Sequence, residues 1–217
     1  MVNTFTPKTS KPAKGSVTYA KTYSLFGKEY AINTWDGEYG IREDILHPMI
    51  HQMEAMLSYH SKVYQVRLES HDKRYSGDNR AFTHRLRVLI KRLKGRGDLR
   101  IAYCWVREKD RSKHYHYHLV LWVNGQKTNS AWAIQTHWEE IHQETGASAP
   151  HRPRKPTPMI HRSQPETQSG AIYTASYMAK ERTKGYGDKG TRDFSTSQLK
   201  HNSKNLETNY VYAKKIA

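Results

Sequence analysis

The most regular segment of the chain is HYHYHLVLWV, which occupies residues 114–123. Successive side chains of a β-strand point to opposite faces, so His114, His116 and His118 lie on one face of this strand. Tyr117 and the leucines that follow it lie on the other face, where they can pack against helices. The segment therefore predicts a strand that buries one face and offers a row of imidazoles on the other.

Around this strand, apolar side chains recur in patterns typical of a mixed α+β fold. The period-two and period-3.6 repeats predict strands at 63–68, 99–106, 115–123 and 159–160, and helices at 79–94, 130–143 and 170–184. A further helix is expected over 41–58, although Pro48 separates its first turns from the rest. The order is that of the ferredoxin-like, or RRM-like, fold with one extra helix. We therefore expect an antiparallel sheet with the helices packed on one face.

The N-terminal part of the chain differs in composition from the rest. Residues 1–18 are rich in Lys, Thr, Ser and Pro, which predicts a flexible basic arm. Residues 19–39 mix aromatic side chains with turn signals such as Asp36-Gly37, which predicts a short hairpin. We expect the arm and hairpin to occupy residues 1–40 and the main domain residues 41–217.

The composition restricts the class of protein. The chain has 217 residues, with 36 Lys and Arg against 20 Asp and Glu, and a formal charge of +16. Such an excess of positive charge indicates a polyanionic partner, most commonly a nucleic acid. The longest apolar run, Leu119–Val123, is far shorter than the ~20 residues of a membrane-spanning helix. No secretory signal is visible, and a single Cys104 fits a reducing cytosol, so a cytoplasmic location without membrane contact is expected.

The histidines at 114, 116 and 118 are spaced as metal ligands. Same-face positions lie about 6.6 Å apart along a strand, so two neighbouring imidazoles can each place a nitrogen about 2.1 Å from one ion. Histidines alone suit zinc, whereas an added carboxylate favours Mg²⁺ or Mn²⁺. Glu108, at the end of the preceding strand, and Glu69, near the end of the first strand, are the candidates. Either carboxylate is also consistent with a surface charge, and the histidines with a structural or pH-sensing cluster.

A second group of reactive side chains falls in the helix expected over 170–184. At 100° per residue, Tyr173, Tyr177, Lys180 and Lys184 lie within an arc of roughly 60°. A tyrosine acts as a nucleophile once its hydroxyl loses the proton, and a neighbouring cation or a metal-bound phosphate favours that state. The stripe indicates tyrosine catalysis, while packing on an amphipathic helix is the alternative in a chain with 15 tyrosines.

Together the two patterns resemble the HUH endonuclease superfamily of rolling-circle replication initiators and relaxases. The resemblance rests on His116-Tyr117-His118 and on Tyr177-Met178-Ala179-Lys180, with Tyr173 placed as in the two-tyrosine phage initiators. The sequence most resembles the inovirus gene-2 type, or YagK/YfjJ-like, family, in which Asn-Gly follows the histidine strand, here Asn124-Gly125. The similarity covers roughly residues 60–200.

The resemblance implies a metal-dependent endonuclease that nicks and rejoins one DNA strand and so initiates rolling-circle replication of a phage, plasmid or satellite. Tyr177 would then be the nucleophile that forms a 5′-phosphotyrosyl intermediate, and Lys180 would contact the phosphate. Tyr173 would be either a second nucleophile or a stacking or core ring. His116 and His118 are the implied ligands of Mg²⁺ or Mn²⁺, and His114 leaves open which adjacent pair binds.

Other basic residues are expected to contact DNA. They are Lys184 and, in a Pro-rich loop, Arg152, Arg154 and Lys155. The implied partners are single-stranded or hairpin origin DNA and a host polymerase and helicase, in the nucleoid of a bacterial host. Two other functions fit the same observations: a transposase or mobilisation relaxase with the same chemistry, and a non-catalytic DNA-binding regulator that holds a structural metal.

Overall fold

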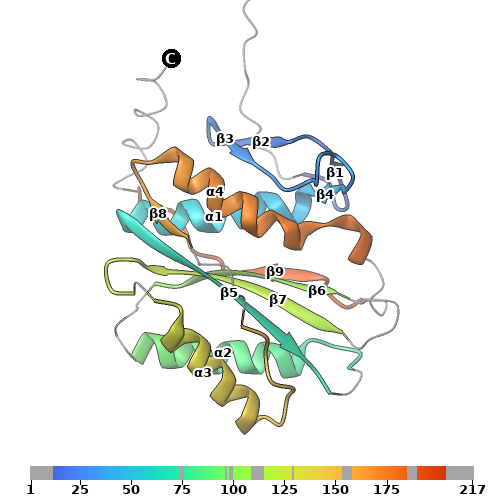
Figure 1. The fold of residues 1–217 in the computed structure, drawn as a ribbon, viewed down its shortest axis with the longest axis vertical. Helices are drawn as coiled ribbons and strands as arrows, with labels where there is room; N and C mark the ends of the chain where they lie inside the picture. The colour runs from blue at the N-terminus through green and yellow to red at the C-terminus, as the bar shows by residue number, and fades with distance from the viewer. Residues whose placement is uncertain are drawn as a thin grey trace, which may run out of the picture.

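A five-stranded antiparallel sheet forms the centre of the protein, as seen in a computed structural model that describes residues 12–73, 76–95, 97, 100–108, 115–128, 130–152, 158–184 and 190–203 (Figure 1). Its strand order is β8-β5-β7-β6-β9. The strands are β5 (Lys62–His71), β6 (Ala102–Glu108), β7 (His116–Asn124), β8 (Met159–His161) and β9 (Phe194–Thr196). The histidine segment therefore forms the central strand.

The four strands β5, β6, β7 and β8 are connected as the sequence predicts. Helix α2 (Arg80–Gly95) connects β5 to β6, and helix α3 (Trp132–Glu144) connects β7 to β8. The resulting order, with the first and third strands at the centre, is that of a ferredoxin-like sheet. The predicted α+β fold is confirmed, and β9 extends the sheet beyond β6.

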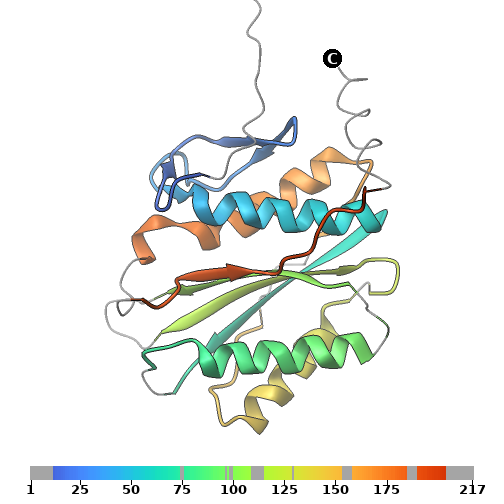
Figure 2. The ribbon, with the colours of Figure 1, turned by 180° about the vertical axis from the view of Figure 1, so that it is seen from behind.

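A second pair of helices covers the opposite face of the sheet. In Figures 1 and 2, α1 (Glu43–Tyr59) and α4 (Pro165–Ser176) lie on one side and α2 and α3 on the other. The expectation that helices pack on one face holds for α2 and α3, but it is wrong for the domain as a whole.

The side chains of β7 explain why both faces are covered. Leu119 and Leu121 belong to the apolar core under α2 and α3, whereas Val120 and Trp122 belong to the core under α1 and α4. An uninterrupted apolar run is typical of a strand that is buried on both faces. His116 and His118 lie on the same face as Val120 and Trp122, so the imidazoles continue the core on the side of α1 and α4.

Helix α1 continues through Pro48 without a break, so the expected separation of its first turns is wrong. A proline in this position removes the hydrogen bond to the carbonyl of Asp44. Leu46 and Met49, on either side of the proline, are fully buried, and their packing outweighs that local cost. The negative charges of Glu43 and Asp44 in the first turn also stabilise the helix, because they lie at the positive end of its dipole.

The predicted hairpin between residues 19 and 39 is confirmed. It consists of β2 (Thr22–Leu25) and β3 (Lys28–Ala31), which pair in antiparallel register. Its turn is Phe26-Gly27, where both residues have positive φ, at 55° and 70°. Two successive residues of this kind form the hairpin turn whose twist matches that of the strands. The turn is therefore not at Asp36-Gly37.

The hairpin packs onto the main domain rather than standing apart from it. Tyr23 and Tyr30 belong to the same apolar core as α1 and α4. The Tyr30 hydroxyl donates to Glu54 of α1 at 2.8 Å, and the Ala31 amide donates to Ser169 of α4 at 2.8 Å.

The segments on either side of the hairpin also pair with each other. Strand β1 (Val17–Thr18) pairs with β4 (Ile41–Arg42), directly before α1. Residues 1–11 of the expected basic arm lie outside the described residues. Among the helices that the structure describes, none combines the length and the apolar character needed to cross a bilayer.

Candidate functional site

Five ionisable side chains meet at the end of the sheet where β5 and β6 end and β7 begins. The register places Glu108 of β6 opposite His116 of β7, and Glu69 and His71 of β5 opposite His118 and His116. Directly paired residues on one face have Cβ atoms about 4.5–5.5 Å apart. The antiparallel pairing therefore gathers residues separated by up to 49 positions in the chain.

Glu108, His116 and His118 form a group that can hold a metal ion. One carboxylate oxygen of Glu108, Oε2, lies 3.2 Å from Nε2 of His116 and 3.2 Å from Nε2 of His118. The three ligand atoms all lie within 4.8 Å of one another. Two imidazoles and a carboxylate are a donor set for a divalent cation. The structure thus brings together three predicted ligands, while the fourth, His114, lies outside the described residues.

Glu69, the other predicted carboxylate, lies behind His118 rather than in that group. Its Oε1 is 3.5 Å from Nδ1 of His118, the nitrogen that does not face Glu108, and its Oε2 is 3.9 Å from Nε2 of His71. A carboxylate on the second nitrogen of a ligand histidine orients the ring and selects its tautomer. His71 in turn stacks on His116, with ring centroids 5.4 Å apart. His71 was missed from sequence, although its position two residues after Glu69 on one strand face was a usable signal.

The charges in this group stabilise one another. Burial alone would raise the pKa of Glu108, but hydrogen bonds from both histidines and the charge of Lys184 hold it far below its ordinary value. Burial alone would lower the pKa of His118, but hydrogen bonds to Glu108 and Glu69 raise it instead. The pKa of Glu69 is also far below its ordinary value, mainly because of hydrogen bonds to His118 and His71.

Helix α3 supports this end of β5 from the other face of the sheet. The indole of Trp138 donates to the carbonyl of Glu69 at 2.7 Å. His142, one turn later, lies 2.7 Å through Nδ1 from the Trp138 carbonyl and 2.9 Å through Nε2 from the Ser70 hydroxyl. Since a carbonyl only accepts, Nδ1 carries the proton and Nε2 accepts from Ser70. The sequence did not identify Trp138 or His142 as part of this site. The one sequence signal for His142 is its spacing of one helical turn from Trp138.

Lys184 is part of the same cluster. Its ammonium forms an ion pair with Oε1 of Glu108, and its side chain is only 1% exposed. Burial lowers the pKa of Lys184, an effect that the charge of Glu108 partly offsets. Lys184, which was expected to contact DNA, is buried in this structure and neutralises the carboxylate of the candidate metal site.

The tyrosine segment differs from the helix predicted over 170–184. Helix α4 ends at Ser176, and two short 3₁₀ turns follow, η1 (Tyr177–Ala179) and η2 (Glu181–Thr183). Lys180 between them has extended ψ of 133° and forms a β-bridge with Ile41. The predicted single stripe of two tyrosines and two lysines is therefore wrong, because the backbone leaves the helix before either lysine.

The exposed tyrosines and the buried lysines of this segment now have separate places. Tyr173 and Tyr177 are 46% and 40% exposed. The Lys180 ammonium is buried and lies 3.1 Å from the centroid of the Tyr177 ring. A cation at that position is attracted by the negative face of the ring and fixes its orientation.

Tyr177 and the metal group each have a buried lysine as a partner. Lys180 contacts the Tyr177 ring, Lys184 forms an ion pair with Glu108, and the positive charge of Lys180 is among the causes that lower the pKa of Lys184. Figures 1 and 2 both show the end of α4 over the end of the sheet at which β5 stops. The tyrosine and the imidazoles thus occupy the same end of the molecule.

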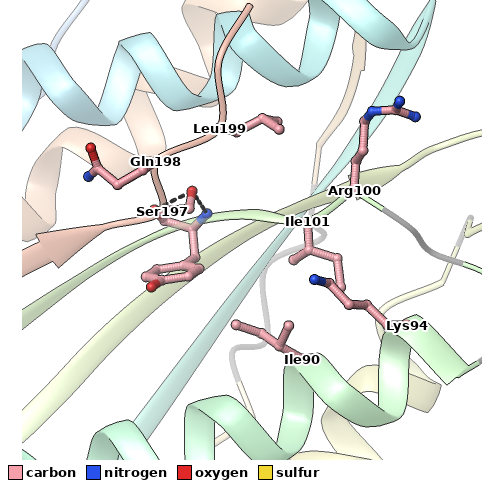
Figure 3. A pocket seen from close by; sticks show the side chains of 8 residues that line it. Ile90, Lys94, Arg100, Ile101, Ser197, Gln198 and Leu199 are labelled. Carbon is pink, nitrogen blue, oxygen red and sulfur yellow. Dashed lines mark hydrogen bonds between the residues drawn. The ribbon is translucent and has the colours of Figure 1, made fainter.

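The other predicted DNA contacts belong to the segment between α3 and β8, where the Ser148 amide donates to the His71 carbonyl at 3.3 Å. Arg152 forms an ion pair with Glu139 of α3, and Arg154 and Lys155 lie outside the described residues. A hollow at the opposite end of the sheet, shown in Figure 3, lies where Ser197 and Tyr103 exchange hydrogen bonds. Lys94 and Arg100 line it together with apolar and hydroxyl side chains, and none of the described residues in its lining is a carboxylate or an imidazole.

The fold and the cluster define a class: a ferredoxin-like sheet that carries a histidine and carboxylate group at one end of its central strand. Residues 27–197 match the YagK/YfjJ C-terminal domain. The match covers most of the chain, and the protein belongs to this family. Neither the curated proteins nor the solved structures gave a significant match.

Proposed function

We propose that the protein is a metal-dependent DNA nickase of the HUH type, which initiates rolling-circle replication of a phage, plasmid or satellite element. The observation that carries the proposal is that an exposed tyrosine, Tyr177, and the group of Glu108, His116 and His118 lie at the same end of the molecule. The ring of Tyr177 contacts Lys180, and Lys184 forms an ion pair with Glu108. An exposed phenol and a cluster of metal-ligating groups at one end of a sheet are the parts that phosphoryl transfer to a tyrosine requires.

The donor set supports Mg²⁺ or Mn²⁺ as the cofactor. His116, His118 and Glu108 would hold the ion, because their ligand atoms already lie within 4.8 Å of one another and a carboxylate accompanies the imidazoles. When bound, the ion supplies polarisation of the non-bridging phosphate oxygens and alignment for in-line displacement. Glu69 would keep the His118 ring in position through its other nitrogen.

The protein's own residues supply the remaining chemistry. The Tyr177 hydroxyl loses its proton to solvent as its oxygen forms a bond to phosphorus, the bond from phosphorus to the 3′ oxygen breaks, and the 3′ oxygen takes up a proton from solvent. The products are a 5′-phosphotyrosyl protein and a free 3′-hydroxyl, and the reverse reaction rejoins the strand without ATP. Lys180 holds the Tyr177 ring and places positive charge beside the negative charge that develops there.

Tyr173 has two roles consistent with its position. It lies one helical turn before Tyr177 and is similarly exposed, which suits a second nucleophile that ends replication by a reciprocal strand transfer. A ring at the same place also suits stacking against the substrate. The partners of such an enzyme are single-stranded or hairpin origin DNA and a host polymerase and helicase, in the cytoplasm of a bacterial host. A transposase or relaxase would use the same residues.

A non-catalytic DNA-binding regulator is the second candidate, and one observation favours it. Both oxygens of Glu108 already have partners within the protein, the two histidines on one side and Lys184 on the other. A cluster neutralised in this way is also consistent with a structural role. Such a protein would bind DNA but would not form a covalent intermediate.

Covalent capture of DNA separates the two candidates. The protein is incubated with Mn²⁺ and a random pool of single-stranded DNA labelled at the 3′ end, since the 5′-phosphotyrosyl linkage retains that part of the strand. We expect a labelled protein band on a denaturing gel that depends on Mn²⁺, is absent in Tyr177→Phe and persists in the matched control Tyr173→Phe.

Two results would overturn parts of this proposal. An adduct that persists in Tyr177→Phe and disappears in Tyr173→Phe would exchange the roles of the two tyrosines. DNA that shifts in a native gel but forms no adduct with the unmodified chain would instead support the regulator.

A further inference from the structure

Three aromatic side chains lie in the segments that flank the β2–β3 hairpin, beside the tyrosine segment. Tyr19 follows β1, Trp35 and Tyr39 precede β4, and the Lys180 ammonium lies over the rings of both Tyr39 and Tyr177. We call Tyr19, Trp35 and Tyr39 the aromatic platform. Trp35 and Tyr19 are 59% and 57% exposed, and the Trp35 and Tyr39 rings lie with centroids 6.4 Å apart. A single exposed ring needs no explanation. Three rings within one short region, two of them mostly in solvent, form a surface that a ligand with flat faces would fit.

The loop that carries Trp35 and Tyr39 is anchored at both ends to the tyrosine segment. At its start, the Asn33 amide donates to the Ser176 hydroxyl at 2.9 Å, one residue before Tyr177. At its end, the Glu181 amide donates to the Gly40 carbonyl at 2.9 Å, and Ile41 forms a β-bridge with Lys180. The loop is therefore tied to the backbone on both sides of the residue proposed as the nucleophile.

Tyr19 joins the platform because residue 40 has no side chain. A Cβ atom on Gly40 would lie 2.4 Å from a methyl group of Val17 and 3.0 Å from the Tyr19 ring. Glycine here lets the β1 segment and its aromatic neighbour lie directly on the loop.

The backbone at Trp35 is held in a conformation that residues other than glycine rarely adopt. Trp35 and Asp36 have φ of 51° and 55°, two successive non-glycine residues in the left-handed region. Hydrogen bonds from the amides of Gly37 and Tyr39 to the Thr34 carbonyl, at 3.1 and 2.9 Å, close the turn that requires this conformation. A strained backbone that presents an exposed tryptophan is a feature found at ligand-binding sites.

The charges around the platform are balanced. Lys180 and Arg182 lie 5.6 and 5.2 Å from the centroid of the Tyr39 ring. Asp36 is paired with Lys21, and Glu38 and Glu181 are exposed nearby in sequence. Binding at this surface would therefore come mainly from the rings, with a weaker dependence on salt than a phosphate-binding groove shows.

We infer that the aromatic platform stacks the unpaired bases of single-stranded DNA beside Tyr177. Every base has a flat aromatic face, so rings in a row bind a single strand without selecting its sequence. The bases of a duplex face one another and offer no free face, which makes unpaired DNA the ligand that this surface fits. The inference rests on the proposed function only for the identity of the strand that is cut, since stacking itself needs neither metal nor nucleophile.

Binding of a fluorescent thymidine oligonucleotide to the full chain, measured by anisotropy in buffer with a chelator, tests the inference. We expect Trp35→Ala to weaken binding about tenfold, because stacking on one aromatic ring contributes on that scale. Trp35→Phe should remain within about threefold of the unmodified chain. Trp132→Ala is the matched control, since Trp132 is 65% exposed but lies on α3, on the far side of the sheet. Duplex of the same length should compete poorly.

Three results would overturn the inference. Trp35→Ala could bind the oligonucleotide as tightly as the Trp132→Ala control, both variants could lose affinity equally, or duplex could compete as well as the single strand. Circular dichroism establishes that each variant is folded. The outcome is independent of catalysis: loss of binding in Trp35→Ala without any adduct from the unmodified chain would retain the platform and reject the nickase. An adduct together with normal binding by Trp35→Ala would do the reverse.

Discussion

The metal group and the tyrosine segment meet at one end of the molecule but are built in different ways. His116 and His118 lie on a regular strand that pairs on both sides, and hydrogen bonds from α3 fix the β5 residues behind them. Tyr177 and Lys180 lie in a segment that leaves its helix at Ser176 and follows short 3₁₀ turns. The first region takes its geometry from strand periodicity, whereas the second depends on a few specific contacts.

The largest effect is expected where the two regions join, at the ion pair between Lys184 and Glu108. Lys184→Met would leave a buried carboxylate without its cation, which costs about 3–5 kcal/mol of unfolding free energy. The measurement is urea unfolding in metal-free buffer. Glu108→Gln combined with Lys184→Met should regain much of the loss, because neither charge is then buried alone.

The control is Arg92→Met, which breaks an exposed pair with Glu140 and Glu144 and should cost about 1 kcal/mol or less. Equal losses in Lys184→Met and Arg92→Met would show that the two regions are not joined in this way.

The second effect concerns the support of β5 by α3. Burial lowers the pKa of His142 from 6.5 to about 4. The unfolded chain therefore binds a proton at a pH where the folded chain does not, and stability falls as the pH drops from about 7.5 to 5, by about 2 kcal/mol from this residue. The check is the urea midpoint of the unmodified chain and of His142→Gln at both pH values. A pH dependence of the same size in His142→Gln would assign the effect to other groups.

The smallest effect is expected in the tyrosine segment. Lys180→Met removes the cation from the Tyr177 ring and should cost about 1 kcal/mol. Tyr177 of this variant should then be nitrated several-fold faster than Tyr177 of the unmodified chain. The nitration rate of Tyr173 is the internal control. Lys21→Met, at an exposed pair with Asp36, should change stability by less than about 0.5 kcal/mol. Unchanged nitration of Tyr177 would show that its position depends on the surrounding backbone and not on this cation.

The same contrast explains how much of the molecule was predictable from sequence. The strand order and the grouping of Glu108 with His116 and His118 follow from period-two repeats and from the short connection between two antiparallel strands. Periodicity carries no information on where a helix ends when the side chains still fit one, so the course of residues 177–184 was missed. The β-bridge between Lys180 and Ile41 competes there with the helix, and it joins residues 139 positions apart.

The roles of individual charged residues were harder to predict than their positions. Nothing in the sequence distinguishes Lys184 from a surface lysine, and only the folded structure shows that it lies beside Glu108. Covering both faces of the sheet was also missed, although the apolar run at 119–123 indicated it. The aromatic platform depends on the contacts of the loop at 33–40 with α4 and the residues after it, which no local pattern predicts.

The register of β7 also has a consequence for the time at which the site is made. Strand β7 carries the imidazoles, the neighbouring strand β6 carries Glu108, and the cation that neutralises Glu108 is Lys184. During synthesis from the N-terminus, a chain that has emerged only as far as α3 contains every candidate ligand of the described site but not its counter-charge. The carboxylate of Glu108 is therefore synthesised before its counter-charge, and Lys184 neutralises it only when the last third of the polypeptide has docked.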